Sequence, residues 1–246
     1  MLYLKALYKK PTLLSIAVIT ALTLSACGQD SSSSAGPEFN PSKDTDTEFN
    51  QLALITNLTD NVITPTFEAF QQQTALQTQS VVDYCVAERL LATQETEQES
   101  VAILLENAQQ QWRASMDIWQ QAEMMLLGPL ADQDGLLRNK IYSWPIVNTC
   151  AVDYDVVYFE SGTVNGQPYD INQRTPSRKG LAALDYLLFS PSLEHSCAST
   201  APPPDWGNFD ESTRKITRCN FAEEVAQDIE NNASSLVELW LASDGY

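Results

Sequence analysis

Residues 100–123, SVAILLENAQQQWRASMDIWQQAE, are the stretch that decides the fold of this chain. Apolar, small and aromatic side chains recur there at steps of three and four residues, which is the period of one helix face. The members of this stripe are Val101, Leu105, Ala108, Trp112, Ser115, Trp119 and Glu123. We predict a helix that Ser100 caps and that ends by Gly128-Pro129, because proline cannot continue a helix.

Helical periodicity also dominates the sequence on both sides of this stretch. The predicted helical segments are 54–85 with a kink or a break at Thr64-Pro65, 136–143 ending at Trp144-Pro145, 175–189 starting at Thr175-Pro176, and 222–240. The four tryptophans at 112, 119, 144 and 240 are expected to pack in the core or between helices rather than to hold a ligand.

Only one segment has a different pattern. Val156 to Phe159 is rich in residues that favour strands, and Asn165-Gly166 is a typical two-residue hairpin turn. We therefore predict an all-α protein, a helical bundle with at most one small β-hairpin, over residues 48–246.

The N-terminus has the pattern of a lipoprotein signal peptide, predicted over residues 1–26. Three lysines precede an apolar run from Leu13 to Leu24, which is too short to cross a bilayer as a stable span. The run ends in Leu24-Ser25-Ala26-Cys27, which resembles the bacterial lipobox. We expect cleavage before Cys27 and a lipid on Cys27 that anchors the protein to a membrane.

Residues 27–47 are predicted to form a flexible tether, because they contain mainly Ser, Gly, Pro, Asp and Thr and offer little to bury. Gly28 occupies the position where an aspartate would retain a lipoprotein at the inner membrane. We therefore expect an exported protein in the cell envelope, anchored to the outer membrane and facing the periplasm.

Charge argues against nucleic-acid binding. The whole chain has a net charge of −18, and removal of the signal peptide leaves 11 basic and 32 acidic residues, a net charge of −21. Such a field repels nucleic acids and attracts cations or basic partners, although acidity also serves solubility alone.

Four cysteines remain besides Cys27, an even number that predicts two disulfides in an oxidising compartment. Three pairings are possible, and we favour Cys197–Cys219 and Cys85–Cys150. A thiolate metal site is disfavoured, because no close Cys-x-x-Cys pair exists.

Common catalytic patterns are absent from the sequence. The single histidine, His195, cannot build a multi-histidine metal site and is expected to lie exposed in a loop. Neither a nucleophile-elbow motif nor a glycine-rich phosphate loop occurs.

The order of short motifs nevertheless resembles one family. The tryptophan stripe before Gly-Pro, the short helix before Trp144-Pro145, the segment Gly180-Leu-Ala-Ala-Leu-Asp-Tyr-Leu-Leu-Phe189 and the helix carrying Cys219 and Trp240 follow in the order seen in imelysins. The family is also called insulin-cleaving membrane protease or iron-regulated protein A. The resemblance implies an all-helical fold and an exported protein linked to iron uptake.

The resemblance also identifies candidate site residues. Its most specific part is the Gly-x-His-x-x-Glu motif, which here reads Gly180, Ala182 and Asp185. Alanine has no donor atom, and a metal at this position would have Asp185 as a ligand, with Glu123 as a second acidic candidate. Asp185 could instead form a structural pair with Arg174 or Arg178. Because a peptidase-type metal site needs about three protein ligands, no catalytic residue is predicted.

Three functions follow from this interpretation. The favoured one is a non-catalytic imelysin-like lipoprotein that acts in the uptake of iron, another divalent metal or another ligand as a binding or partner protein. The alternatives are a metal-dependent peptidase and a structural or interaction lipoprotein. Imelysins generally continue for several more helices, so we expect the first half of the fold and the start of the second. An exposed apolar helix face would then bind iron-uptake proteins or a second imelysin-like chain.

Overall fold

The computed structural model describes residues 50–242, which include most of the predicted helical domain. The predicted signal peptide, Cys27 and the tether lie outside the described residues. No helix within the described part is long and apolar enough to cross a membrane.

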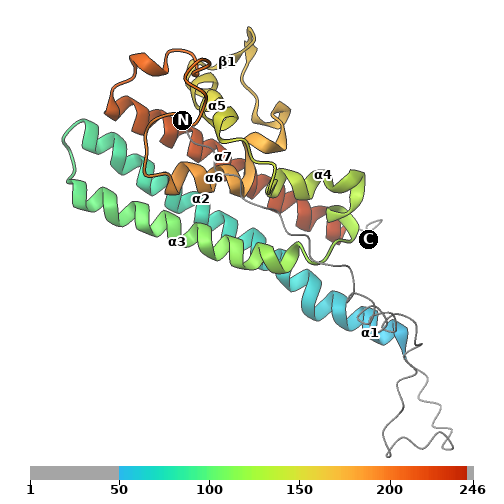
Figure 1. The fold of residues 1–246 in the computed structure, drawn as a ribbon. Helices are drawn as coiled ribbons and strands as arrows, with labels where there is room; N and C mark the ends of the chain where they lie inside the picture. Colours follow the sequence, from blue (N-terminus) through green and yellow to red (C-terminus); the bar gives the residue numbers. More distant parts are fainter. Residues whose placement is uncertain (1–49, 243–246) are drawn as a thin grey trace, which may run out of the picture. The chain divides into compact units, whose positions relative to one another are not determined.

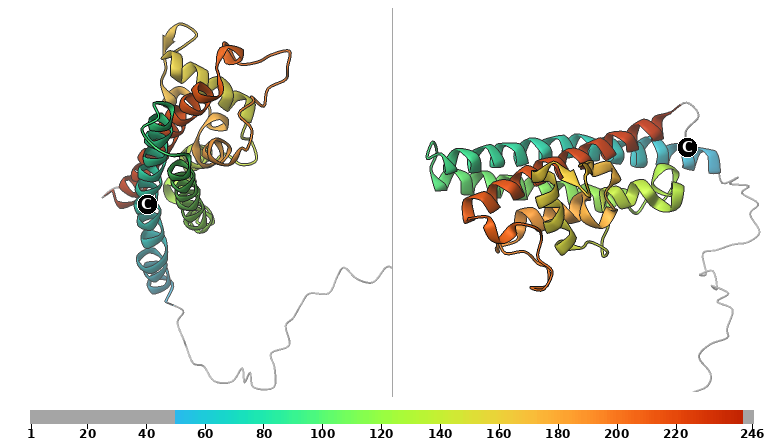
Figure 2. Two further views of the ribbon diagram at one scale, coloured as in Figure 1. Left: turned by 90° about the vertical axis from the view of Figure 1, so that its left-hand side faces the viewer. Right: turned by 90° about the horizontal axis from the view of Figure 1, so that it is seen from above.

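Three long helices form the frame of the bundle: α2 (Thr64–Ala92), α3 (Gln98–Ala122) and α7 (Glu211–Leu241). Helix α2 packs against both α3 and α7, so it lies at the centre of this frame (Figures 1 and 2). Two shorter helices, α5 (Thr149–Ser161) and α6 (Gly180–Phe189), pack on α7. The all-α prediction is confirmed.

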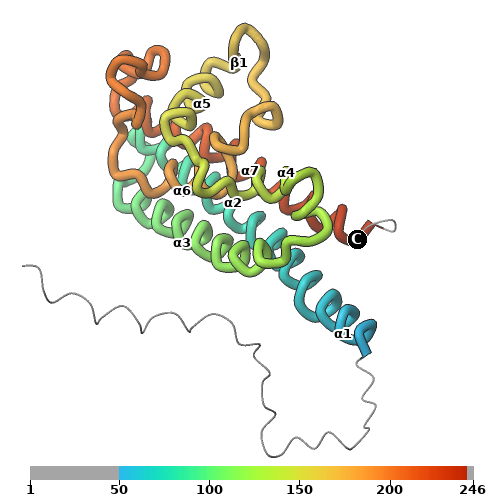
Figure 3. Tube along the Cα trace, turned by 45° about the vertical axis from the view of Figure 1, so that its right-hand side comes forward, coloured from blue at the N-terminus to red at the C-terminus, as the bar shows by residue number. Residues whose placement is uncertain are grey.

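Helix α1 (Gln51–Leu58) continues into α2 through a π-helical turn, η1 (Thr59–Ile63), so the chain is not broken at Thr64-Pro65. Helix α1 extends from one end of the bundle, as Figure 3 shows, and buries none of its residues. Its large apolar side chains are exposed, at Leu52, Leu54, Ile55 and Leu58. Whether an exposed helix face of this chain binds another chain stays a prediction.

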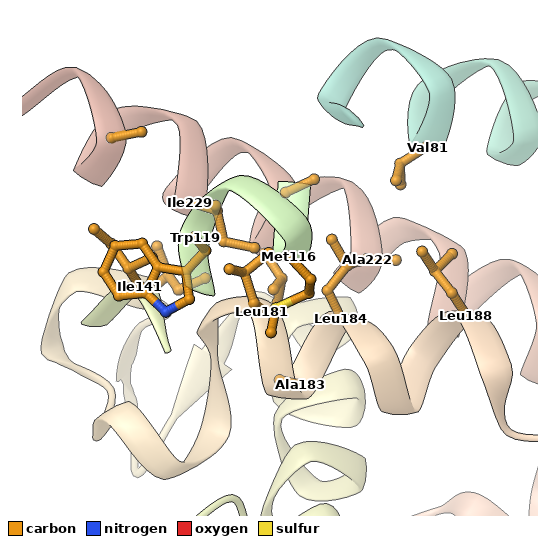
Figure 4. Close-up of a cluster of buried hydrophobic side chains, with 14 of the residues drawn as sticks. Val81, Met116, Trp119, Ile141, Leu181, Ala183, Leu184, Leu188, Ala222 and Ile229 are labelled. Carbon is orange, nitrogen blue, oxygen red and sulfur yellow. The ribbon is translucent and has the colours of Figure 1, made fainter. Parts of the chain in front are cut away.

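Helix α6 is almost entirely apolar and is buried on several sides, as expected for a helix without a polar face. Leu181, Leu184 and Leu188 face α7, whereas Ala183 points the other way, toward α5 (Figure 4). Trp119 of α3 is fully buried in the same core. Helix α6 thus carries the motif residues through the middle of the domain.

Two predicted helix starts need correction. Helix α3 begins at Gln98, two residues before Ser100, and ends at Ala122, ahead of the 3-10 turn η2 (Gly128–Leu130). The segment after Thr175 forms only a 3-10 turn, η4 (Pro176–Arg178), and Lys179 is extended before α6 begins. The side chain of Lys179 is buried with Asp228 of α7, with its Nζ 3.1 Å from the carboxylate.

The strand prediction for Val156 to Phe159 is wrong, since these residues belong to α5. Asn148 caps the helix by accepting from the Ala151 amide at 3.0 Å, and Gly162 ends it in the left-handed conformation. Burial of Val156 against the core outweighs its preference for strands. The predicted Asn165-Gly166 turn is correct and joins the two short strands β1 (Thr163–Val164) and β2 (Gln167–Pro168).

The remaining elements are α4 (Asp132–Ile141) and two 3-10 turns, η3 (Ile171–Gln173) and η5 (Trp206–Asn208). All four described cysteines form disulfides, as predicted, but the favoured pairing is wrong. The bonds join Cys85 to Cys219 and Cys150 to Cys197. The Cys85–Cys219 bond connects α2 with α7. The spacing of cysteines in the sequence did not show that these two helices lie side by side.

Candidate functional site

Gly180 begins α6 with a φ of +74°, a conformation that favours glycine. A Cβ atom at this position would lie 2.6 Å from the carbonyl oxygen of Ile141 and 2.7 Å from that of Lys140. The glycine of the motif therefore permits the start of α6 to contact the end of α4. Its role in this structure is the close packing of the two backbones.

Ala182, at the histidine position of the motif, is buried and 7% exposed. Its methyl group cannot donate or accept a hydrogen bond. The neighbouring residue is held firmly, because the indole of Trp112 donates to the carbonyl oxygen of Leu181 at 2.9 Å. The helix backbone is thus fixed at this position without an imidazole.

The carboxylates of Glu123 and Asp185 both act electrostatically on one phenol, that of Tyr142. Burial raises the pKa of the Tyr142 hydroxyl, and the negative charges of Glu123 and Asp185 raise it further. Burial likewise raises the pKa of the Asp185 carboxyl. We call Glu123, Tyr142 and Asp185 the motif site. The two carboxylates reach it from the end of α3 and the middle of α6, and Tyr142 reaches it from the end of α4.

Sequence analysis missed Tyr142 as a member of this site. A usable signal was its position directly after the short helix that ends before Trp144-Pro145, one of the family-like motifs. Trp144 itself is 68% exposed and does not pack in the core, in contrast to our prediction. Trp119 and Trp240 are buried as predicted, and Trp112 is partly buried.

The proposed structural pair of Asp185 with Arg174 or Arg178 is wrong. Both arginines bind Asp155 instead, a fully buried carboxylate on α5. Arg174 donates to it from Nε at 2.8 Å and from Nη2 at 2.6 Å, and Arg178 donates from Nη1 at 2.9 Å. Neither arginine therefore pairs with Asp185, which we assign to the motif site.

A resident metal of the peptidase type does not fit these residues. Within residues 50–242 no group of three or more His, Cys, Asp and Glu side chains could hold a metal ion. The motif site offers two carboxylates, whereas a catalytic zinc site uses about three protein ligands and an open position. We therefore derive no hydrolytic step from this site.

His195 is not the exposed loop residue that we predicted. Its ring lies edge-on to the indole of Trp206, with 6.1 Å between the ring centroids, and it is partly buried. The loop that carries it is held by Ser196, whose amide donates to the buried carboxylate of Asp153 at 2.7 Å, and by the Cys150–Cys197 bond. His195 lies in that loop, outside the motif site.

The comparisons with known proteins agree with this fold and with the motif order. The family model described as Imelysin matches residues 63–246. The chain belongs to the imelysin family. It is similar to the iron-regulated protein A of Synechococcus elongatus, at 30% identity over 138 residues, which are 56% of this chain and 33% of that protein.

A solved structure supports the same fold. It is that of an iron-regulated protein A precursor from Parabacteroides distasonis, with a TM-score of 0.50 and 19% identity over 78% of this imelysin and 46% of that chain. This imelysin thus spans about a third of the curated relative and less than half of the solved one.

Proposed function

We propose that this imelysin is an exported, lipid-anchored protein of iron acquisition that binds a ligand and does not cleave peptides. The observation that supports this proposal is the composition of the motif site, which holds two carboxylates and a phenol and has Ala182 in place of a histidine. The names of the relatives in Synechococcus and Parabacteroides support a connection with iron.

The donor atoms of the motif site indicate what kind of ligand it binds. Carboxylate and phenol oxygens are hard donors, and hard cations prefer them to soft thiolates. Two carboxylates are too few to enclose a metal ion, so the remaining ligands come from water or from a chelating molecule delivered with the ion. Iron is therefore cargo in this proposal rather than a catalytic group.

The experiment is a titration of the purified chain with ferrous, ferric, zinc and copper ions and with haem, followed by calorimetry. We expect ferric iron to bind and the variants Asp185→Ala and Glu123→Ala to lose at least tenfold in affinity. Asp117→Ala is the matched control, because Asp117 is an exposed carboxylate on α3. Binding that is absent, or equally strong in all three variants, contradicts the proposal.

The peptidase alternative comes from the family label and makes a separate prediction. We expect no peptide cleavage that a chelator removes. The variant Ala182→His restores the imidazole of the family motif on the same helix as Asp185, and a gain in zinc affinity would show that a third ligand completes the site. Chelator-sensitive cleavage by the unmodified chain would favour the peptidase function instead.

The lipid anchor is tested on Cys27. In a bacterial host fed a labelled fatty acid, the chain is expected to take up the label and to fractionate with the outer membrane. Cys27→Ser should abolish both. A labelled Cys27→Ser chain, or an unlabelled natural one, would contradict the proposed anchor.

A further inference from the structure

A hollow of about 300 Å³ lies between α5, the β1–β2 turn and the segment that precedes α6. The side chains that line it are Tyr154, Tyr158, Val164, Asn165, Arg174 and Arg178. The hollow lies on different elements from the motif site, and the proposed function above does not use it. Its size is at the lower end of small-molecule sites.

The hollow carries positive charge in an acidic protein. None of its lining residues is acidic, although the chain has a net charge of −18. Asp155 lies beneath it, fully buried, and can balance only one of the two guanidinium groups. One positive charge therefore remains at the surface of the hollow.

Hydrogen-bond donors also remain. Arg174 uses Nε and Nη2 on Asp155, and Arg178 uses Nη1 on Asp155 and on the carbonyl oxygen of Ala151. Among residues 50–242 we find no acceptor for Nη1 of Arg174 or for Nε and Nη2 of Arg178. The two side chains are 15% and 28% exposed, so a small solute can reach these atoms.

Both guanidinium groups are held in place before any ligand arrives. The Arg174 guanidinium lies 5.9 Å from the ring centre of Tyr158 and 5.8 Å from that of Tyr169. The bidentate bond to Asp155 fixes its plane. Within the described residues the Tyr158 hydroxyl has no hydrogen-bond partner, so it offers one more donor at the rim. A site fixed in this way loses little entropy when it binds.

We propose that this hollow binds the carboxylate group of a small organic acid. A guanidinium presents paired N–H groups that match the two oxygens of a carboxylate. The aromatic rings of Tyr154 and Tyr158 form the apolar wall for the carbon skeleton of the acid. Because both arginines already pair with Asp155, they are held in place and do not turn toward other acidic side chains of the protein.

The test is a calorimetric titration of the purified chain with citrate, acetate, benzoate and inorganic phosphate at low and at physiological salt. We expect one saturable site for at least one of the carboxylates and weaker binding of phosphate. Arg178→Gln should weaken carboxylate binding at least tenfold, because it removes a charged donor pair, and hydrogen bonds to charged groups are stronger than neutral ones. Tyr158→Phe should weaken it severalfold.

The control is Arg113→Gln, which removes a half-exposed arginine of α3 that pairs with Glu106. It should bind carboxylates like the unmodified chain. Tyr158→Phe removes only one oxygen atom and leaves the Asp155 ion pairs in place, so it tests the site even if Arg178→Gln does not fold. Equal binding by Tyr158→Phe and the unmodified chain, stronger binding of phosphate, or no saturable carboxylate binding would overturn the proposal.

Discussion

The Cα atom of Gly180 lies so close to the carbonyl oxygen of Ile141 that a Cβ atom would stand 2.6 Å from it. This contact joins the start of α6 to the end of α4, and Tyr142 of the motif site is the next residue along the chain from Ile141. The position of α6 therefore depends on the absence of a side chain at residue 180.

Gly180→Ala is expected to destabilise the domain by more than the cost of a positive φ alone. That cost is about 1–3 kcal/mol, and the contact with the Ile141 oxygen adds to it. Gly166→Ala is a matched control, because its φ is +76° and no atom lies within 4 Å of the added Cβ. Urea unfolding measures both variants. Equal losses of stability would show that the close contact is unimportant.

Lys179→Met is expected to cost about 3–5 kcal/mol, because it leaves the carboxylate of Asp228 buried without its partner. Adding Asp228→Leu should recover most of the loss, since an apolar pair needs no compensation. The exposed pair of Lys215 with Glu211 supplies the control. Lys215→Met should cost less than about 1 kcal/mol, and a similar cost for both lysine variants would contradict the argument.

Asp185→Asn is expected to raise the melting temperature at pH 7. Burial raises the pKa of this carboxyl in the folded state, so the fold binds its proton more tightly than the unfolded chain does. The resulting stabilisation is complete below the unfolded pKa of about 3.9 and is lost as pH rises through the folded value. The gain from Asp185→Asn should therefore shrink between pH 7 and pH 4.

The exposed Asp117→Asn serves as the control for this prediction and should change the melting temperature little at either pH. A lower melting temperature for Asp185→Asn at pH 7 would show that the carboxylate supports the fold. The expected rise would show that Asp185 is kept at a cost in stability, as functional carboxylates often are.

Replacing each disulfide by a pair of serines is expected to destabilise the domain. The chain-entropy model gives about 5 kcal/mol for Cys85–Cys219 and about 4 kcal/mol for Cys150–Cys197, from loops of 134 and 47 residues. Mass spectrometry of peptides from the unreduced protein should find these two pairs. Peptides that link Cys85 to Cys150 would show a different pairing.

The sequence predicted the fold class well because its signal is periodic. The spacing of Trp112 and Trp119, and the breaks at Gly128-Pro129 and Trp144-Pro145, determine helices and their ends from local chemistry. Helix α5 was missed because Val156 to Phe159 favour strands when considered alone. Only burial against the core, which no local pattern reveals, makes them helical.

The candidate site was predictable only in part. Motif order pointed to Gly180, Ala182, Asp185 and Glu123, but not to Tyr142, which reaches the site from another helix. The prediction that Arg174 or Arg178 pairs with Asp185 was also wrong. Asp155 is 30 residues before Asp185, and nothing in the sequence shows which of the two carboxylates faces the arginines.

The nesting of the Cys150–Cys197 bond inside the Cys85–Cys219 bond has a consequence for production of the protein. If the chain is exported with its N-terminus first, Cys85 emerges long before Cys219, and Cys150 is the next of the described cysteines to follow it. Premature oxidation then traps a mispaired species, which thiolate exchange must undo. Yield should then depend on an isomerase in the receiving compartment, and co-expressing one should raise the fraction of correctly paired protein.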